Sequence, residues 1–503
     1  MSKKQLILII FILLKFTIQY VAFDPVYELH RDEFFHLDLG KHLAWGYSSV
    51  PPITGIISYI ISLLGNSVFW VKFFPALFGA LTIVVVWKSV EELDGGLFAL
   101  ILASAGVTFS VLVRINTLYQ PNSLDFLLWT MLFWIILKYI NSEENKWLYF
   151  AAITFAFAFL NKYNIGFLIL GLFPALLLTR HRKVFRNKHF YFAMIISFII
   201  ILPNLVWQYQ NNFPVFHHLT ALRDSQLVNV NRFNFFMEQM LFFVGSLFVI
   251  ILAFLSFFIY PRFRKYKIFF LTFIFSLSIF ALLRAKSYYT IGLYPIFLAF
   301  GSVYLEKLLD SGWLRYLRPV AILIPVTIFI LFFQLMLPVL SPEEIVSKSA
   351  LFEKFNLNRW EDGRVHRLPQ DYADMLGWRE LADIVDSASV LIDDKKNTII
   401  HCDNYGQAGA INYYSKQKHA QAYTMSADYI NWYPLDEFQI NNVILVKERF
   451  DTDKDREKEK PLFENITFVG EVKNEYARER GTRVYVLAGA RQSINEIIKE
   501  EIR

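Results

Sequence analysis

The sequence is divided into blocks of about twenty consecutive apolar residues, separated by short polar stretches. A helix of about twenty residues crosses a hydrocarbon core of about 30 Å. Hydrophobic residues make up 55% of the 503 residues, which exceeds the share that is typical of a soluble globular domain. The chain is therefore expected to be a polytopic α-helical membrane protein.

Eleven stretches have the composition of a membrane-spanning helix, and the expected count is therefore about eleven. They are residues 5–23, 67–87, 97–113, 123–140, 147–160, 164–179, 190–206, 236–259, 267–283, 288–305 and 319–340. The fifth and sixth are short, and they flank Asn161-Lys162-Tyr163-Asn164. We expect these two to form a tight hairpin.

Basic residues between the spans predict the orientation. If the N-terminus is cytoplasmic, residues 180–188, 262–267 and 307–318 are cytoplasmic and carry most of the Lys and Arg residues between the spans. This asymmetry agrees with the positive-inside rule. It also accounts for the formal net charge of +6 without a nucleic-acid partner.

The composition changes after about residue 345, where polar residues dominate and no further span follows. A helix is expected at 375–388, and strands at 397–401, 442–447, 466–472 and 482–487. We therefore predict a transmembrane catalytic domain at 1–344, with interfacial helices in its first external loop (about 24–66). Residues 345–503 are expected to form an α/β domain, which an odd number of spans places outside the cytoplasm.

The segment Asp32-Glu33-Phe34-Phe35-His36 directly follows the first span. Carboxylates at a bilayer boundary are costly unless they face water, a metal or a substrate. On a helix, both acids lie on the same face as His36. Asp32 and Glu33 are therefore candidate catalytic residues, and Glu33 with His36 is a candidate site for a divalent metal ion. The alternative is a solvated surface helix, continuing as an amphipathic pattern toward Pro51-Pro52.

Asp125 begins a strongly apolar stretch, where an ionised carboxylate needs a partner. It is a third candidate catalytic residue. The alternative is a carboxylate that is favoured by the dipole at a helix start, with Asn122 or Ser123 as the cap.

The segment Arg284-Ala285-Lys286-Ser287-Tyr288-Tyr289 lies between two spans on the predicted outer side. Arg284, Lys286, Tyr288 and Tyr289 offer the cations and hydroxyl donors that bind a lipid phosphate. The alternative is ordinary snorkelling in an aromatic belt. The positive-inside rule disfavours basic residues on the outer side. Their presence there therefore favours a binding function for this segment.

Residues 207–234 form a polar and aromatic stretch on the same predicted side. Its Trp207, His217 and His218, together with Asn122, are candidates for binding a sugar or an acceptor. The alternative is a membrane-surface loop.

The sequence has neither a P-loop nor a G-x-G-x-x-G nucleotide motif, and its single cysteine, Cys402, excludes an intrachain disulfide.

Several segments together resemble bacterial family 39 glycosyltransferases. These are Asp32-Glu33 with residues 37–47 and Pro51-Pro52, and residues 120–125, 202–208, 286–289 and 404–411. The family is similar to the dolichyl-phosphate-mannose protein mannosyltransferases and to the aminoarabinose transferases that act on lipid A. The resemblance covers most of the chain, and the first loop is its most specific part.

The resemblance implies a C-type glycosyltransferase fold in a bacterial inner (plasma) membrane, an external active site and a polyprenyl-phosphate sugar donor. Asp32 matches the catalytic base of the family, and Lys286 and Tyr289 match its stretch for donor phosphate contact. Two positions depart from the pattern. Asn122 stands where many relatives have a second Asp, and Ser49-Val50 stand where aminoarabinose transferases have a Glu-Lys pair that helps to bind metal and phosphate.

We therefore expect a membrane glycosyltransferase that moves a sugar from the polyprenyl-phosphate donor to a lipid, glycan or protein acceptor, with inversion of configuration. The alternative is a transporter or flippase for lipid-linked sugars. That class places its carboxylates mid-span in two related halves, whereas Asp32 and Glu33 lie in a predicted loop and no two halves of the chain match. A third alternative is a scaffold for assembly of the cell envelope.

Overall fold

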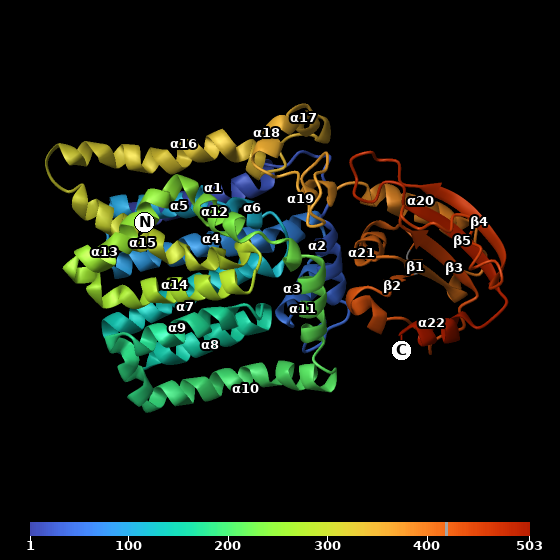
Figure 1. Ribbon diagram of the computed structural model, residues 1–503, viewed down its shortest axis with the longest axis horizontal. Helices are drawn as coiled ribbons and strands as arrows, with labels where there is room; N and C mark the ends of the chain where they lie inside the picture. Colours follow the sequence, from blue (N-terminus) through green and yellow to red (C-terminus); the bar gives the residue numbers. More distant parts are fainter. Residues whose placement is uncertain (418–420, 503) are drawn as a thin grey trace. The chain divides into compact units, whose positions relative to one another are not determined.

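The computed structural model describes residues 1–417 and 421–502 (Figure 1). It divides into two compact units. The first comprises Met1–Phe23, Ala44–Thr54 and Leu64–Val339, and the second comprises Asp24–Leu43, Gly55–Leu63 and Leu340–Arg503. Most of the loop after the first helix therefore belongs to the same unit as the C-terminal part of the chain.

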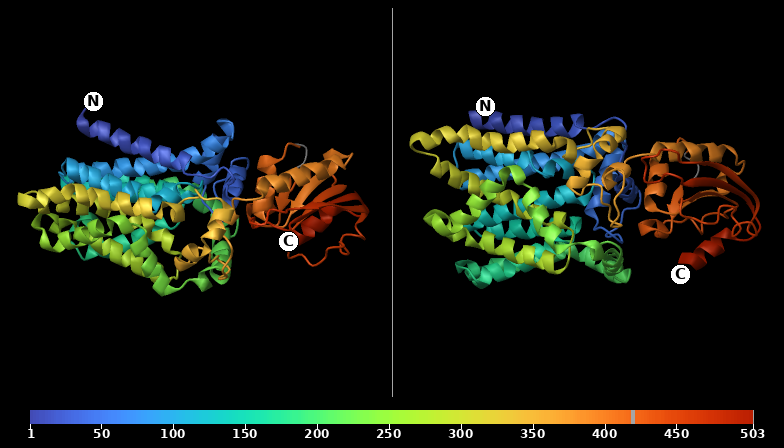
Figure 2. Two further views of the ribbon diagram at one scale, coloured as in Figure 1. Left: turned by 90° about the horizontal axis from the view of Figure 1, so that it is seen from above. Right: turned by 45° about the horizontal axis from the view of Figure 1, so that its top comes forward.

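The first unit is helical, and most of its helices run roughly side by side (Figure 1, Figure 2). Its α-helices are α1 (Lys3–Val21), α4 (Val68–Glu92), α5 (Leu97–Thr108), α6 (Leu112–Ile115), α7 (Pro121–Ser142), α8 (Lys146–Asn161), α9 (Ile165–Leu177), α10 (Lys188–Gln210), α11 (Pro214–Ser225), α12 (Arg232–Leu241), α13 (Leu247–Ile259), α14 (Lys267–Leu282), α15 (Pro295–Leu308) and α16 (Arg318–Met336). Its short 3-10 helices are η1 (Arg180–Arg186), η2 (Leu227–Asn229), η3 (Val244–Ser246), η4 (Pro261–Tyr266), η5 (Ser287–Leu293) and η6 (Gly312–Leu317).

Each of the eleven expected spans coincides with helix in the described part of the chain. Six helices there are long and apolar enough to cross a membrane, and three further candidates are helix pairs bent by 105°, 64° and 48°. The other two expected spans correspond to α5 and α8, which have 12 and 16 residues. The polytopic helical fold is therefore confirmed, and the count of eleven stays a prediction.

Small residues and rings fill the interior of the first unit. A Cβ added to Gly301 of α15 would lie 1.9 Å from the carbonyl oxygen of Val249 in α13. The absence of a side chain therefore lets these two helices approach closely. Phe257 and Phe300 pack edge to face beside this contact, with ring centroids 4.9 Å apart. The bundle is therefore held by close packing rather than by polar contacts at this point.

A five-stranded sheet forms the centre of the second unit, which confirms the expected C-terminal α/β domain. Its strands are β1 (Thr398–Cys402), β2 (Ala422–Thr424), β3 (Asn442–Lys447), β4 (Phe463–Glu471) and β5 (Arg483–Ala490), in the order β2-β1-β3-β5-β4. β1 is parallel to β2 and β3, and β5 is antiparallel to β3 and β4. Four of these strands were expected. β2 was not, because three residues are too short for an alternating pattern.

The helices of the second unit are α2 (Arg31–Leu39), α3 (Ile53–Leu63), α17 (Pro342–Ser347), α18 (Ser349–Lys354), α19 (Gln370–Ala373), α20 (Trp378–Val390), α21 (Tyr405–Tyr414) and α22 (Ile494–Ile502), with η7 (Lys395–Asn397) and η8 (Ala427–Asn431). Of these, α20, α21 and α22 lie against the sheet (Figure 1). Ile498 of α22 packs with Val443 and Leu487 on one face. α20 and α21 lie over the other face. Successive side chains of a strand point to opposite faces, so each strand contributes side chains to both contacts.

The first loop differs from its expected form. The amphipathic pattern predicted helix onward from His36, but α2 ends at Leu39 and residues 40–50 are not helical. The cause is contact with α3. Ser58 donates a hydrogen bond to the carbonyl oxygen of His36 (2.6 Å), and a Cβ on Gly40 would lie 2.6 Å from the backbone nitrogen of Tyr59. The chain therefore turns away where it crosses α3, which does form the second helix expected in this loop.

Candidate active site

His30 caps the start of α2. Its Nδ1 accepts a hydrogen bond from the backbone N–H of Asp32 (3.2 Å), and Glu33 Oε2 accepts one from the backbone N–H of His30 (2.8 Å). This reciprocal pattern is a capping box. Glu33 is fully buried, and its Oε2 stabilises the start of α2 through this hydrogen bond. Its catalytic and metal-binding roles stay predictions.

The Asp32 side chain is one-third exposed. Its Oδ1 accepts a hydrogen bond from the Tyr405 hydroxyl (2.9 Å), and the guanidinium of Arg31 lies 4.4 Å from the centroid of the Tyr405 ring. Burial raises the pKa of Asp32, but the positive charges that His30, Arg31 and His36 can carry, with the Tyr405 hydrogen bond, lower this pKa to about 2. Asp32 is therefore a carboxylate anion at neutral pH, suited to orient a hydroxyl and to accept its proton late in a reaction.

The start of α2 is also tied to Asp374, which is buried in the same unit. The Asp374 carbonyl oxygen accepts a hydrogen bond from the backbone N–H of Arg31 (3.1 Å), and its carboxylate pairs with Arg478 (3.1 Å). Burial raises the pKa of Asp374, against the opposing charges of Arg478, His30 and Arg31. Asp32 and Asp374 are therefore two carboxylates with opposite pKa shifts at one helix start.

Metal binding by Glu33 and His36 stays a prediction. His36 is buried in α2, and Glu33 is engaged in the capping box. Across residues 1–417 and 421–502, no group of three or more His, Cys, Asp or Glu side chains could hold a metal ion.

A second polar cluster lies in the first unit, where α7 meets the turn between α8 and α9. Asn122 Oδ1 accepts a hydrogen bond from Lys162 Nζ (2.6 Å), and Asp125 Oδ2 accepts one from Asn164 Nδ2 (3.0 Å). Asp125 is fully buried, and its Oδ1 has no hydrogen-bond partner in the described part of the chain. The expected hairpin is present, and its polar residues face the start of α7. We call these four residues the α7 cluster.

Tyrosines and a second lysine lie beside the α7 cluster. Lys162 Nζ is 4.4 Å from the ring centroid of Tyr289 and 5.5 Å from that of Tyr288. The negative charge of Asp125 and, more weakly, the positive charge of Lys286 act on Lys162, and the charge of Lys286 also acts on His218. Burial and that charge lower the pKa of His218. Two lysines that repel each other beside phenol groups form a site that an anion would stabilise.

Gln239 of α12 holds η5, the short helix that carries Tyr288 and Tyr289. Its Oε1 accepts hydrogen bonds from the hydroxyls of Thr290 (2.6 Å) and Tyr294 (2.8 Å), and its Nε2 donates to the carbonyl oxygen of Ser287 (3.4 Å). Ser287 also donates a hydrogen bond to Glu238. η5, which carries Tyr288 and Tyr289, is therefore held by a neighbouring helix.

Three of the expected residues are not brought into this cluster. Arg284 is exposed, and the structure gives its side chain no ion pair or hydrogen bond with a described residue. His217 is exposed as well. Trp207 packs instead on Gly46, where an added Cβ would lie 2.4 Å from the indole ring.

The sequence interpretation missed Lys162, Asn164 and Tyr405. The sequence pattern places Lys162 and Asn164 in a turn, and a lysine between two asparagines at the junction of two apolar stretches is itself a signal of a polar site. Tyr405 gave no such signal, because the contact with Asp32 joins positions 373 residues apart.

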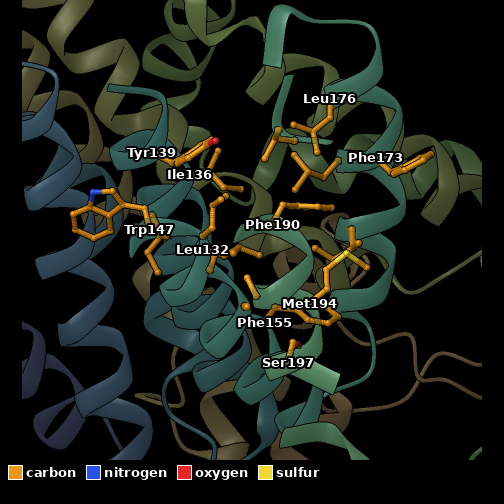
Figure 3. A pocket seen from close by; sticks show the side chains of 18 of the residues that line it. Leu132, Ile136, Tyr139, Trp147, Phe155, Phe173, Leu176, Phe190, Met194 and Ser197 are labelled. Atoms are coloured by element: carbon orange, nitrogen blue, oxygen red, sulfur yellow. The ribbon is translucent and has the colours of Figure 1, made fainter. Parts of the chain in front are cut away.

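An apolar cavity of about 700 Å³ lies among α7, α8, α9, η1 and α10 (Figure 3). Leu132 and Ile136 of α7, Phe155 of α8 and Met194 of α10 are among the lining residues. One end of the cavity lies close to the α7 cluster. Phe159 lines the cavity, and its ring contacts that of Tyr163 with centroids 5.0 Å apart. Tyr163 is the neighbour of Lys162 in the chain. The size and lining of the cavity suit a hydrocarbon chain.

The chain is similar to known proteins in part of its sequence and in its fold. Residues 49–207 match the sequence model of the family described as dolichyl-phosphate-mannose-protein mannosyltransferase. The crystal structure of ArnT from Cupriavidus metallidurans bound to undecaprenyl phosphate has a TM-score of 0.65 and 14% identity, covering 98% of this chain and 99% of that chain. The apo structure of the same protein has a TM-score of 0.62 and 12% identity, covering 96% and 98%.

No curated protein sequence gives a significant match to the chain. At these identities the structural matches establish the fold, and the fold extends over nearly the whole chain. The resemblance read from the sequence is confirmed: the chain is a polytopic membrane protein with the C-type glycosyltransferase fold, similar to ArnT and to the protein mannosyltransferases.

Proposed function

We propose that this protein transfers a glycosyl group from a polyprenyl-phosphate donor to an acceptor hydroxyl at the extracytoplasmic face of the membrane. Asp32 orients the hydroxyl and accepts its proton. The acceptor oxygen forms a bond to the anomeric carbon of the sugar while the bond from that carbon to the phosphate oxygen breaks. The bonding electron pair leaves with polyprenyl phosphate, and in-line displacement inverts the anomeric configuration.

The observation that carries this proposal is the pair formed by Lys162 of the α7 cluster and Lys286 beside it. Lys162 and Lys286 repel each other, and Tyr288 and Tyr289 lie next to Lys162. A phosphate bound there relieves the repulsion. The same cations then stabilise the negative charge that develops on the departing phosphate, where preorganised charges contribute most to rate.

The apolar cavity supports a lipid-linked donor in particular. Phe159 lines it one turn before Lys162, so a phosphate at Lys162 leaves an attached hydrocarbon chain close to the cavity. A soluble nucleotide sugar has no group for such a space. The solved structure of ArnT, bound to undecaprenyl phosphate, concerns a protein of the same fold and agrees with this choice of donor.

The test uses the full chain in lipid nanodiscs, a labelled polyprenyl-phosphate sugar, and acceptor membranes from a strain that lacks the protein. Wild type should transfer label. Asp32→Asn should lower kcat by about 10²-fold or more, and Lys286→Gln should raise the donor KM by about tenfold, because a charge-assisted phosphate contact is lost.

Lys188→Gln is the matched control, because Lys188 is exposed at the start of α10 and outside both clusters. It should leave kcat and KM unchanged. Transfer by Asp32→Asn at the wild-type rate would contradict the role of Asp32. Movement of labelled donor across a bilayer without glycosyl transfer would instead favour a flippase.

A further inference from the structure

The carboxylate of Asp32 is held by a residue from the C-terminal part of the second unit. Tyr405, the first residue of α21, donates its hydroxyl to Asp32 Oδ1 at 2.9 Å. α2 and α21 also pack very closely. A Cβ added to Gly409 of α21 would lie 2.8 Å from Cβ of Phe34, and one added to Gly406 would lie 3.2 Å from Cβ of Arg31. The two helices therefore form one packed pair.

A second carboxylate fixes the other end of α2. Asp38 accepts hydrogen bonds from Asn412 Nδ2 of α21 (2.8 Å) and from the Tyr429 hydroxyl (2.7 Å), and it pairs with Lys41 (2.7 Å). Asp38 is buried, where an unmade hydrogen bond is costly. Because α2 is anchored at both ends, the backbone of Asp32 is fixed relative to α21.

Tyr405 contributes its ring as well as its hydroxyl. The guanidinium of Arg31 lies over the ring, 4.4 Å from its centroid. The hydroxyl supplies a directional hydrogen bond to Asp32, whereas the surrounding charged groups act mainly through their fields. The titratable groups that face Asp32 are His30, Arg31 and His36 from α2 and its cap, Asp374 from the segment before α20, and Tyr405.

We propose that Tyr405 is a positioning residue for glycosyl transfer, holding the Asp32 carboxylate in the orientation that receives the acceptor hydroxyl. The C-terminal domain is then part of the catalytic apparatus and not only an acceptor-binding module. This inference rests on the function proposed above for Asp32. Misplacement of a reacting group by about 1 Å can lower a rate by about 10²-fold.

Tyr405→Phe tests the role of the hydroxyl alone, because the substituted ring still stacks with Arg31. We expect kcat to fall about 10- to 100-fold, while the donor KM stays within about twofold, since the donor phosphate is assigned to Lys162 and Lys286. Tyr433→Phe is the matched control. Its hydroxyl contacts His401 (2.8 Å) in the same unit, and its loss should leave both constants unchanged.

Two comparisons separate this inference from its alternatives. If Asp32→Asn transfers at the wild-type rate, the function proposed for Asp32 is wrong. If Asp32→Asn is inactive but Tyr405→Phe has the wild-type kcat, only the role of Tyr405 is wrong. Tyr429→Phe removes the hydroxyl that contacts Asp38. Equal losses of kcat and of thermal stability in Tyr405→Phe and Tyr429→Phe would show that Tyr405 only anchors α2.

Discussion

At the scale of single residues, the start of α7 explains one departure from the family pattern. Asn122 stands where the resemblance to family 39 glycosyltransferases leads us to expect an Asp, and its amide oxygen accepts a hydrogen bond from Lys162 (2.6 Å). The buried carboxylate lies three residues later, at Asp125, and accepts a hydrogen bond from Asn164. Asp125 already places a negative charge near Lys162, and the amide of Asn122 adds no second one. Lys162 can therefore still attract a phosphate.

Asn122→Asp should therefore weaken donor binding. The new carboxylate would form a close ion pair with Lys162, and the compensated lysine would attract phosphate less strongly. We expect the donor KM to rise by about tenfold, measured with the labelled polyprenyl-phosphate sugar. Asn122→Ala, which removes the acceptor without adding charge, should raise KM less. A lower KM for Asn122→Asp than for the wild type would contradict this account.

At the scale of elements, short breaks between helices position the polar groups. The three-residue turn between α8 and α9 presents Lys162 and Asn164, and η5 presents Tyr288 and Tyr289. Each break occurs where an apolar stretch ends, so side chains there can reach polar partners without crossing the hydrocarbon core. The apolar cavity lies among the helices on either side of the first of these breaks, with lining residues from α7, α8, α9 and α10 (Figure 3).

Filling that cavity should change donor selection by chain length. Ala152 of α8 lines the cavity, and Ala152→Phe would occupy part of its volume. We expect the KM for a long-chain polyprenyl donor to rise several-fold, while the KM for a short-chain analogue stays near the wild-type value, because only the long chain needs the space.

Ile153→Phe is the matched control for this prediction. Ile153 is the next residue of α8, is partly exposed and is not among the lining residues, so its substitution should affect neither donor. The KM of each donor is compared between Ala152→Phe and wild type. An equal rise for the long and the short donor would contradict a cavity that binds the hydrocarbon tail.

At the scale of the whole molecule, the two units carry separate parts of the proposed chemistry. Asp32 and Tyr405 lie in the second unit, and the α7 cluster and Lys286 lie in the first. The expectation that all of them face the non-cytoplasmic side comes from the distribution of Lys and Arg between the spans. This orientation stays a prediction.

Cysteine labelling in intact cells tests that topology. In a Cys402→Ser background, single cysteines replace Lys183, Asn212 or Asp436, all of which are exposed. A membrane-impermeant maleimide should label the Asn212 and Asp436 positions from outside, and the Lys183 position only after permeabilisation. Labelling of Lys183 from outside, with Asn212 protected, would reverse the orientation.

The sequence alone determined the membrane class, the order of the apolar helices and the α/β character of the C-terminal domain. Those properties follow from the length and periodicity of apolar stretches, which are local. It also singled out Asp32, Asp125 and Lys286, because charge at the edge of an apolar stretch is costly unless it has a use.

Only the tertiary structure decided which side chains meet. It joined Lys162 to Asn122 across 40 positions and Tyr405 to Asp32 across 373, and it left Arg284 and His217 exposed. Such contacts depend on how helices pack and on where glycines such as Gly409 permit close approach. No local pattern of residue types encodes that geometry, so it appears only when the chain is folded.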